Sequence, residues 1–170
     1  MKKLLLLFFC LITINSFSQG PEKMLKKLGI QLPEVSPAIG NYVDAQQVGK
    51  FIFLSGRGPR NECGDYIKGK LGVELTVKEG YYAARITAIN QIAVLRKELG
   101  SLDKIKRIVK VNAYVNSAPF FYDQPGVVNG FSDLLVALFG KSGRHARTAV
   151  GVNALPLNMA LEVEMIVEVK

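Results

Sequence analysis

The chain has 170 residues and a formal net charge of +8, from 22 lysines and arginines against 14 aspartates and glutamates. The basic residues are scattered among apolar ones and form no dense stripe with aromatic residues, so the sequence argues against a nucleic-acid-binding protein. One histidine and two cysteines in the whole chain are too few for a histidine metal site or a cysteine cluster.

The N-terminus has the pattern of an export signal. Two lysines precede an apolar run over residues 4–14, about half of the roughly 20 apolar residues that a membrane-spanning helix needs. Small residues follow, and we predict cleavage after Ser18, which makes residues 1–18 a signal peptide. The mature protein should then be periplasmic or secreted, with no membrane contact. A lipid at Cys10 is disfavoured, because bulky residues precede this cysteine.

The mature chain has the length of one domain. We place this domain at residues 40–170, behind an N-terminal extension at residues 19–39 that contains a short amphipathic stretch and several prolines. Cys63 would be the one cysteine left after cleavage, which excludes an intramolecular disulfide. It lies in a polar, turn-rich stretch, which is more typical of a loop thiol than of a nucleophile, since no second histidine exists to activate it.

The first part of the domain has the composition of a meander of strands. Residues 41–45 and 51–55 read as two strands joined by a turn around Gly49. Residues 66–72 are compatible with a third strand.

A helix should follow this meander. Thr76 and Glu79 have the spacing of a capping box, which marks the start of a helix, and Gly100 provides a left-handed stop. The apolar positions between them recur at spacings of three and four, as on one face of a helix: Ala84, Ala88, Ile92, Leu95 and Leu99.

The second half repeats the order of strand and helix. Residues 107–115 alternate between apolar and polar side chains, which predicts a strand with one solvated face. Asp123 and Pro125 can open a second helix, which Gly140 closes. The apolar stripe of this helix consists of Val127, Phe131, Leu134 and Leu138.

The last two segments, residues 146–153 and 161–169, both read as strands and are separated by a short turn that contains Pro156. We predict that they form a hairpin. In the final strand Glu162 and Glu164 lie on the same face, since side chains alternate along a strand.

These elements predict an α+β fold in which one mixed sheet carries two helices on one face. The other sheet face would hold residues such as Phe53, Tyr114 and Ile166 and would be only partly apolar. Such a face suits a subunit interface better than open water, so we expect a homo-oligomer.

Few residues have chemical capacity, and each has an ordinary structural interpretation. Arg147 is followed on its own strand face by the small residues Ala149 and Gly151, which would leave room for a ligand. Glu162 and Glu164 are compatible with charges that blunt a sheet edge. The remaining candidates are a strand aromatic, a polar helix position and an exposed histidine with no assigned role: Tyr42, Asn129 and His145.

Several separated segments resemble the Rid family of imine deaminases, also called the YjgF family. They span most of the chain from Gly40 to its end, and the last of them is the most specific. The matching segments are Gly40-Asn41-Tyr42, residues 49–56 with Pro59, Val109-Lys110-Val111, Val128-Asn129, and Ala146-Arg147-Thr148-Ala149-Val150 with Leu155-Pro156 and Glu162-Val163-Glu164.

The resemblance implies a chorismate mutase-like fold, assembled as a homotrimer with a small-molecule cleft at each subunit interface and no cofactor. It also implies hydrolysis of 2-imino acids and their enamine precursors to 2-keto acids and ammonia. Carried onto this sequence, Arg147 binds the substrate carboxylate, Glu162 orients the water, Tyr42 and Asn129 line the cleft, and the amide near Ala149 contacts the substrate.

The chain departs from the family pattern in three places. Asn41-Tyr42-Val43 stands where family members commonly have Pro-Tyr-Ser, and Ala149 stands where they often have a cysteine. The segment at residues 141–145 is slightly longer than the corresponding segment of the family. The family's known role is cytosolic, whereas an export signal is predicted here. A non-catalytic module that binds a small carboxylate or a protein is therefore the alternative function. Ribonuclease activity has been attached to some relatives, but the weak charge excess and the lack of a histidine pair argue against it here.

Overall fold

The computed structural model describes residues 20–37 and 40–170, so the predicted signal peptide lies outside the described residues. Three short 3-10 turns accompany the main elements, at Leu102–Lys104, Gly140–Gly143 and Pro156–Asn158. The helices and strands are α1 (Pro21–Lys27), β1 (Ala45–Val48), β2 (Phe51–Arg57), α2 (Val77–Leu99), β3 (Ile105–Asn116), α3 (Gln124–Phe139), β4 (Ala146–Val152) and β5 (Leu161–Val169).

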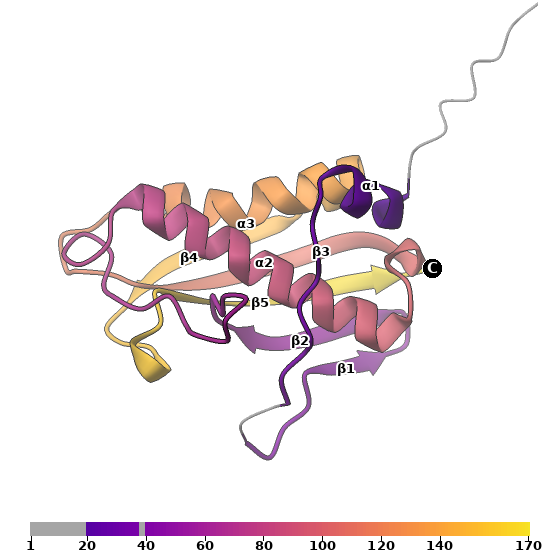
Figure 1. The fold of residues 1–170 in the computed structure, drawn as a ribbon, viewed down its shortest axis with the longest axis horizontal. Coiled ribbons are helices and arrows are strands. Elements are labelled where there is room, and N and C mark those ends of the chain that lie inside the picture. The colour runs from indigo at the N-terminus through magenta and orange to yellow at the C-terminus, as the bar shows by residue number, and fades with distance from the viewer. Residues whose placement is uncertain (1–19, 38–39) are drawn as a thin grey trace, which may run out of the picture.

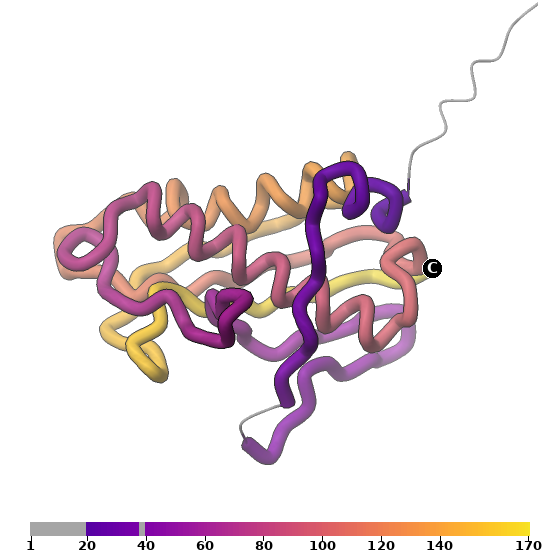
Figure 2. The backbone as a smooth tube through the Cα atoms, in the orientation of Figure 1, coloured from indigo at the N-terminus to yellow at the C-terminus, as the bar shows by residue number. Residues whose placement is uncertain are grey.

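The five strands form one mixed sheet in the order β1-β2-β5-β3-β4. β4 runs parallel to β3, and the other neighbours are antiparallel. The two long helices, α2 and α3, lie side by side over one face of the sheet (Figures 1 and 2), and the short α1 lies at one end of α3. The predicted α+β sheet with two helices on one face is confirmed.

The meander contains two strands. β1 and β2 form a hairpin whose turn contains Gly49 at φ +58°, a left-handed conformation that glycine adopts without a steric penalty. The predicted first strand is shifted, because it begins at Ala45. The predicted third strand at 66–72 is wrong: Gly69 and Gly72 take positive φ values and interrupt the extended chain, which makes only isolated bridges.

The predicted hairpin of the last two strands is also wrong, because β3 lies between them. Val111 of β3 pairs with Arg147 of β4 on one side and with Met165 of β5 on the other. β3 is the longest strand, with 12 residues, and accepts a neighbour along both edges. A parallel neighbour needs a long crossover, and α3 supplies it between β3 and β4.

Both long helices begin and end as predicted. The Thr76 hydroxyl accepts a hydrogen bond from the Glu79 amide at 3.3 Å, and the Glu79 carboxylate accepts one from the Thr76 amide at 2.8 Å. Asp123 caps α3 by accepting from the Gly126 amide. The predicted apolar stripes are buried except for the partly buried Leu99, and they fill the space between the helices and the sheet.

Residues 20–37 pack against the rest of the described chain. Leu25 of α1 is only 3% exposed, and Figure 1 shows the chain after α1 crossing over α2. Apolar side chains of this crossing segment, Ile30, Leu32 and Val35, pack against the core. Among the described helices, none combines the length and apolarity that crossing a bilayer requires.

Candidate functional site

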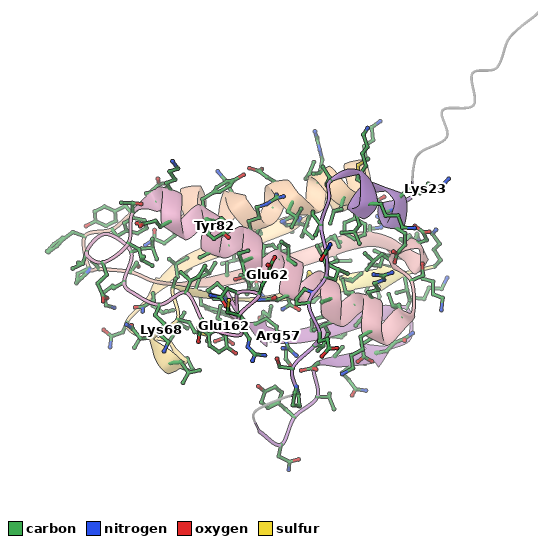
Figure 3. All side chains as sticks on the ribbon, in the orientation of Figure 1. Lys23, Arg57, Glu62, Lys68, Tyr82 and Glu162 are labelled. Atoms are coloured by element: carbon green, nitrogen blue, oxygen red, sulfur yellow. The ribbon has the colours of Figure 1, made fainter. Side chains whose placement is uncertain are left out.

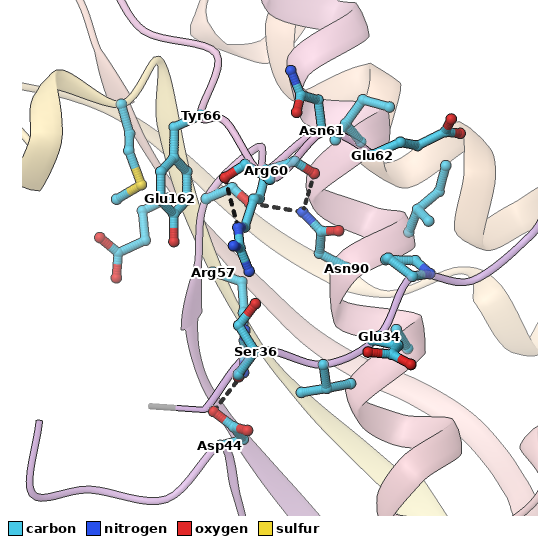
Figure 4. A pocket seen from close by; sticks show the side chains of 18 of the residues that line it. Glu34, Ser36, Asp44, Arg57, Arg60, Asn61, Glu62, Tyr66, Asn90 and Glu162 are labelled. Atoms are coloured by element: carbon cyan, nitrogen blue, oxygen red, sulfur yellow. Dashed lines mark hydrogen bonds and ion pairs between the residues drawn. The ribbon is translucent and has the colours of Figure 1, made fainter. Parts of the chain in front are cut away.

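An open cavity of about 1130 Å³ lies where β2 leaves the sheet. Its walls come from the crossing segment 31–37, the end of β2, the loop 60–66, one face of α2 and the start of β5. Glu162 and Tyr42, both predicted as site residues, line it. Figure 4 shows Glu162 and Tyr66 toward one side of this cavity and Glu34 toward the other, and we call it the Glu162 pocket.

Glu162 lies at the pocket wall, close to the backbone of β2. Its carboxylate lies against Gly56, where an added Cβ atom would force the Glu162 side chain to move. Burial raises the pKa of the Glu162 carboxyl above its ordinary value, and the negative charge of Glu164 raises it further. Glu162 can therefore exchange a proton at a higher pH than an exposed glutamate does.

Glu164 has a different environment, although it lies only two residues away. Its carboxylate accepts hydrogen bonds from Asn112 Nδ2 at 3.0 Å and from the Tyr114 hydroxyl at 3.2 Å. β5 lies inside the sheet, between β2 and β3, so the interpretation of Glu162 and Glu164 as edge-blunting charges is wrong. Glu164 is engaged with β3, whereas Glu162 faces the pocket.

Two arginines line the same pocket and were not singled out in the sequence. Arg57 forms an ion pair with Asp44 at 2.5 Å and donates to the Ser36 carbonyl at 3.2 Å, which ties the crossing segment to β2. Arg60 donates through Nε to the Gly64 carbonyl at 2.8 Å. Figure 3 labels Arg57 and Glu162, which come from neighbouring strands, near the end of β2. Both arginines lie in segments that read as strand or turn, so no sequence pattern marked them.

Arg147 lies in a separate group on β4 and α3. Its Nη1 atom donates to Asn129 Oδ1 and to Ser132 Oγ, both at 3.0 Å, and its Nη2 atom lies 3.5 Å from the Pro125 carbonyl oxygen. Ala149 follows on the same strand face. We call Arg147, Asn129, Ser132 and His145 the Arg147 cluster.

Two features of the Arg147 cluster differ from the sequence interpretation. His145 is partly buried and contacts Ser132, because the 3-10 turn at 140–143 folds it back against α3. The space beside Gly151 is not open, since Ser117 and Gln124 occupy it. Ser132 was missed, although it follows Asn129 by three residues and therefore lies on the same face of α3.

Arg147 and Glu162 lie on opposite faces of the sheet. Arg147 pairs with Val111, which is buried under the helices. Glu162 pairs with Tyr114 and alternates with the buried Leu161 and Val163, so it points to the face without helices. Arg147 thus contacts Asn129, with Ala149 next on the same strand face, whereas Tyr42 and Glu162 line the Glu162 pocket. A single chain does not bring Arg147 and Glu162 to one site.

Within residues 20–37 and 40–170, no group of three or more histidine, cysteine, aspartate or glutamate side chains is placed to hold a metal ion. Cys63 lies at the surface with a free thiol.

Comparisons with known proteins find a matching family model, related sequences and related structures. The model of a family described as "YjgF/chorismate mutase-like, putative endoribonuclease" matches residues 22–169. Protein TCP17 of Trypanosoma cruzi is 46% identical over 145 residues, which cover 85% of this chain and 91% of that protein.

Two further relatives carry functional descriptions. A 2-iminobutanoate/2-iminopropanoate deaminase of Dermatophagoides farinae is 30% identical over 148 residues, covering 86% of this chain and all of its own length. The crystal structure of a "putative endoribonuclease" from Shewanella oneidensis superposes with a TM-score of 0.85 at 36% identity, covering 89% of this chain and 100% of that one.

Proposed function

The chain belongs to the Rid/YjgF family, and from this premise we propose that it hydrolyses small 2-imino acids and the related enamines to 2-keto acids and ammonia. The observation that supports the proposal is the presence of two complementary groups, the Arg147 cluster and the Glu162 pocket. One group offers an anchored guanidinium at Arg147, and the other offers a carboxylate of raised pKa at Glu162.

Arg147 supplies the recognition of a carboxylate. Both Nη1 hydrogens are taken by Asn129 and Ser132 of α3, so the orientation of the guanidinium is fixed. Nε has no hydrogen-bond partner within residues 20–37 and 40–170. Nη2 has two hydrogens, and the Pro125 carbonyl accepts one of them at 3.5 Å. Nε and the second Nη2 hydrogen can therefore bind a carboxylate through two parallel charge-assisted hydrogen bonds, which hold the adjacent C=N carbon at a set distance.

Glu162 positions and activates the attacking water. Once ionised, its carboxylate can orient a water molecule and accept a proton from it as the oxygen attacks the C=N carbon. Orientation of both reactants converts a bimolecular step into one within a complex. Imines already hydrolyse in water, so the reaction needs positioning and proton transfer more than a strong nucleophile.

We propose that the two groups meet between subunits of a homotrimer. β4, which carries Arg147, is an edge strand of the sheet. The helix-free face carries large apolar side chains that a single chain leaves exposed, among them Phe53 at 46% and Val150 at 42%. Association through this face and the β4 edge would bury these side chains and bring Arg147 of one copy to the Glu162 pocket of the next.

The proposal is tested with iminopropanoate generated in place by an amino acid oxidase. The purified protein should speed formation of keto acid and ammonia over the protein-free reaction. If 2-oxobutanoate binds in calorimetry but no imine is turned over, the chain is a carboxylate-binding module on the same fold. If it neither binds acids nor turns over imines, both functions are excluded.

Cleavage of RNA is the competing activity, since the descriptions of the family and of the Shewanella oneidensis relative name it. The chain has a single histidine, so the paired imidazoles that often perform acid–base cleavage are not available. Incubation with RNA in metal-free buffer decides the point, and cleavage that co-purifies with the wild-type protein would favour the ribonuclease.

We further propose that residues 1–18 direct export. N-terminal sequencing of the protein recovered outside the cytoplasm should begin at Gln19, and an intact Met1 would contradict this.

A further inference from the structure

His145 ends a directed chain of hydrogen bonds that leads to Arg147. Its Nδ1 atom lies 2.6 Å from the Gly143 carbonyl oxygen, and its Nε2 atom lies 3.0 Å from Ser132 Oγ. Ser132 Oγ in turn accepts from Arg147 Nη1 at 3.0 Å. The three side chains come from α3, from β4 and from the segment just before β4.

The direction of each bond follows from the chemistry of the atoms. A carbonyl oxygen can only accept, so Nδ1 carries a hydrogen and donates it to Gly143. In the neutral ring Nε2 is then a bare acceptor, and the Ser132 hydroxyl must donate to it. With its hydrogen directed at His145, Ser132 turns an oxygen lone pair toward Arg147 Nη1.

The His145 end of this series of hydrogen bonds is fixed by close packing. Gly143 is buried against α3, where a Cβ atom would collide with the Leu135 carbonyl, so the backbone that holds Nδ1 cannot shift easily. Burial lowers the pKa of His145; the hydrogen bond to Gly143 opposes this, and the charge of Arg147 lowers it further. The ring is therefore neutral at neutral pH, as the directed chain requires.

We propose that His145 is a positioning residue, which acts through the Ser132 hydroxyl to fix the guanidinium of Arg147 with Nε and one Nη2 hydrogen free for a carboxylate. The carboxylate in this statement comes from the proposed function, whereas the hydrogen-bond chain exists without it. A hydroxyl free to rotate would present either its hydrogen or its lone pair to Arg147, and Nη1 would lose one of the two hydrogen bonds that fix it.

Two substitutions of His145 separate positioning from a merely structural role. In His145→Gln the amide stands at the place of Nε2 and can still accept from Ser132. In His145→Asn it stands at the place of Nδ1, where it can bind Gly143 but cannot reach Ser132. Calorimetry with 2-oxobutanoate should give His145→Gln an affinity within about threefold of wild type and His145→Asn a loss of about tenfold.

The Ser132→Ala variant should lose a similar factor, and Ser132→Ala combined with His145→Asn should lose no more than either alone, because both act through one hydroxyl. Thermal unfolding of each variant separates loss of affinity from loss of folded protein. Additive losses in folded variants, or equal losses for His145→Gln and His145→Asn, would overturn the proposal.

A second readout does not depend on the proposed function. His145 is the only histidine of the chain, so its ring nitrogens give a single set of ¹⁵N resonances. They should report a neutral ring protonated at Nδ1, and Arg147→Ala should raise the pKa of the ring. A ring protonated at Nε2, or a ring pKa unchanged by Arg147→Ala, would refute the positioning role of His145 even if no acid binds. Failure of acid binding alone would count against the proposed function.

Discussion

The side chains of Arg147 on β4 and Glu162 on β5 point to opposite faces of one sheet, although only β3 separates their two strands. A small 2-imino acid is too short to reach both groups through a sheet. If both groups act on one substrate, as proposed, the site must be shared between copies of the chain.

Arg147→Lys keeps the positive charge but removes the planar fork, so it separates attraction from orientation. We expect a loss of about tenfold or more in kcat/KM, from a hydrogen-bonded charge pair worth about 1.5–3 kcal/mol. Steady-state kinetics on iminopropanoate measures it. Activity equal to wild type would mean that the guanidinium does not grip the substrate.

Glu162→Gln removes the proton acceptor and preserves the shape of the side chain. We expect kcat to fall by about 10²–10⁴ with KM little changed, as for a group that acts in the chemical step. Glu164→Gln is the matched control, because this residue lies on the same strand face but is engaged by Asn112 and Tyr114. Equal effects of the two substitutions would argue against a specific role for Glu162.

The raised pKa of Glu162 predicts a specific pH dependence. The carboxylate must be ionised to accept a proton, so kcat should fall as the pH drops through this pKa, at a higher pH than for an ordinary glutamate. Stability has the opposite sign: the protonated form is favoured in the folded chain, so its contribution is full below the unfolded pKa and is lost as the pH rises through the folded one. A pH–rate profile with no acid limb above the ordinary glutamate range contradicts the assignment.

Gly56→Ala tests whether the position of Glu162 beside the backbone of β2 matters. The added Cβ would collide with the Glu162 carboxylate, so the side chain must move away from the pocket wall. We expect kcat to fall by about tenfold or more, since small misplacements of a reacting group are costly. Gly49→Ala is the control: its Cβ meets no atom within 4 Å, and it should cost stability through its positive φ while leaving kcat unchanged. Wild-type activity in Gly56→Ala would show that the position of Glu162 is not critical.

Local signals in the sequence predicted local structure well. The Thr76–Glu79 capping box and the stripe at Val127, Phe131, Leu134 and Leu138 depend on neighbours along the chain, and both are present. The neighbours of β4 and β5 in the sheet were not predictable in this way, because their alternation fits any neighbouring strand. Insertion of β3 between them depends on packing of the whole sheet.

The candidate site was predicted in pieces. Side-chain alternation correctly placed Glu162 and Glu164 on one face, and the family resemblance singled out Arg147 and Asn129, which are in contact. The contact between Ser132 and His145 was missed, because it depends on a 3-10 turn that folds the chain back on α3.

Mixed oligomers test the shared site most directly. Chains carrying Arg147→Ala and chains carrying Glu162→Gln should each be inactive alone. When the two are co-expressed, about one quarter of the interfaces in randomly mixed trimers would join an intact Arg147 to an intact Glu162, so deaminase activity should return to that fraction of wild type. Mixed oligomers that form, as verified by mass, yet recover no activity would contradict a site shared between subunits.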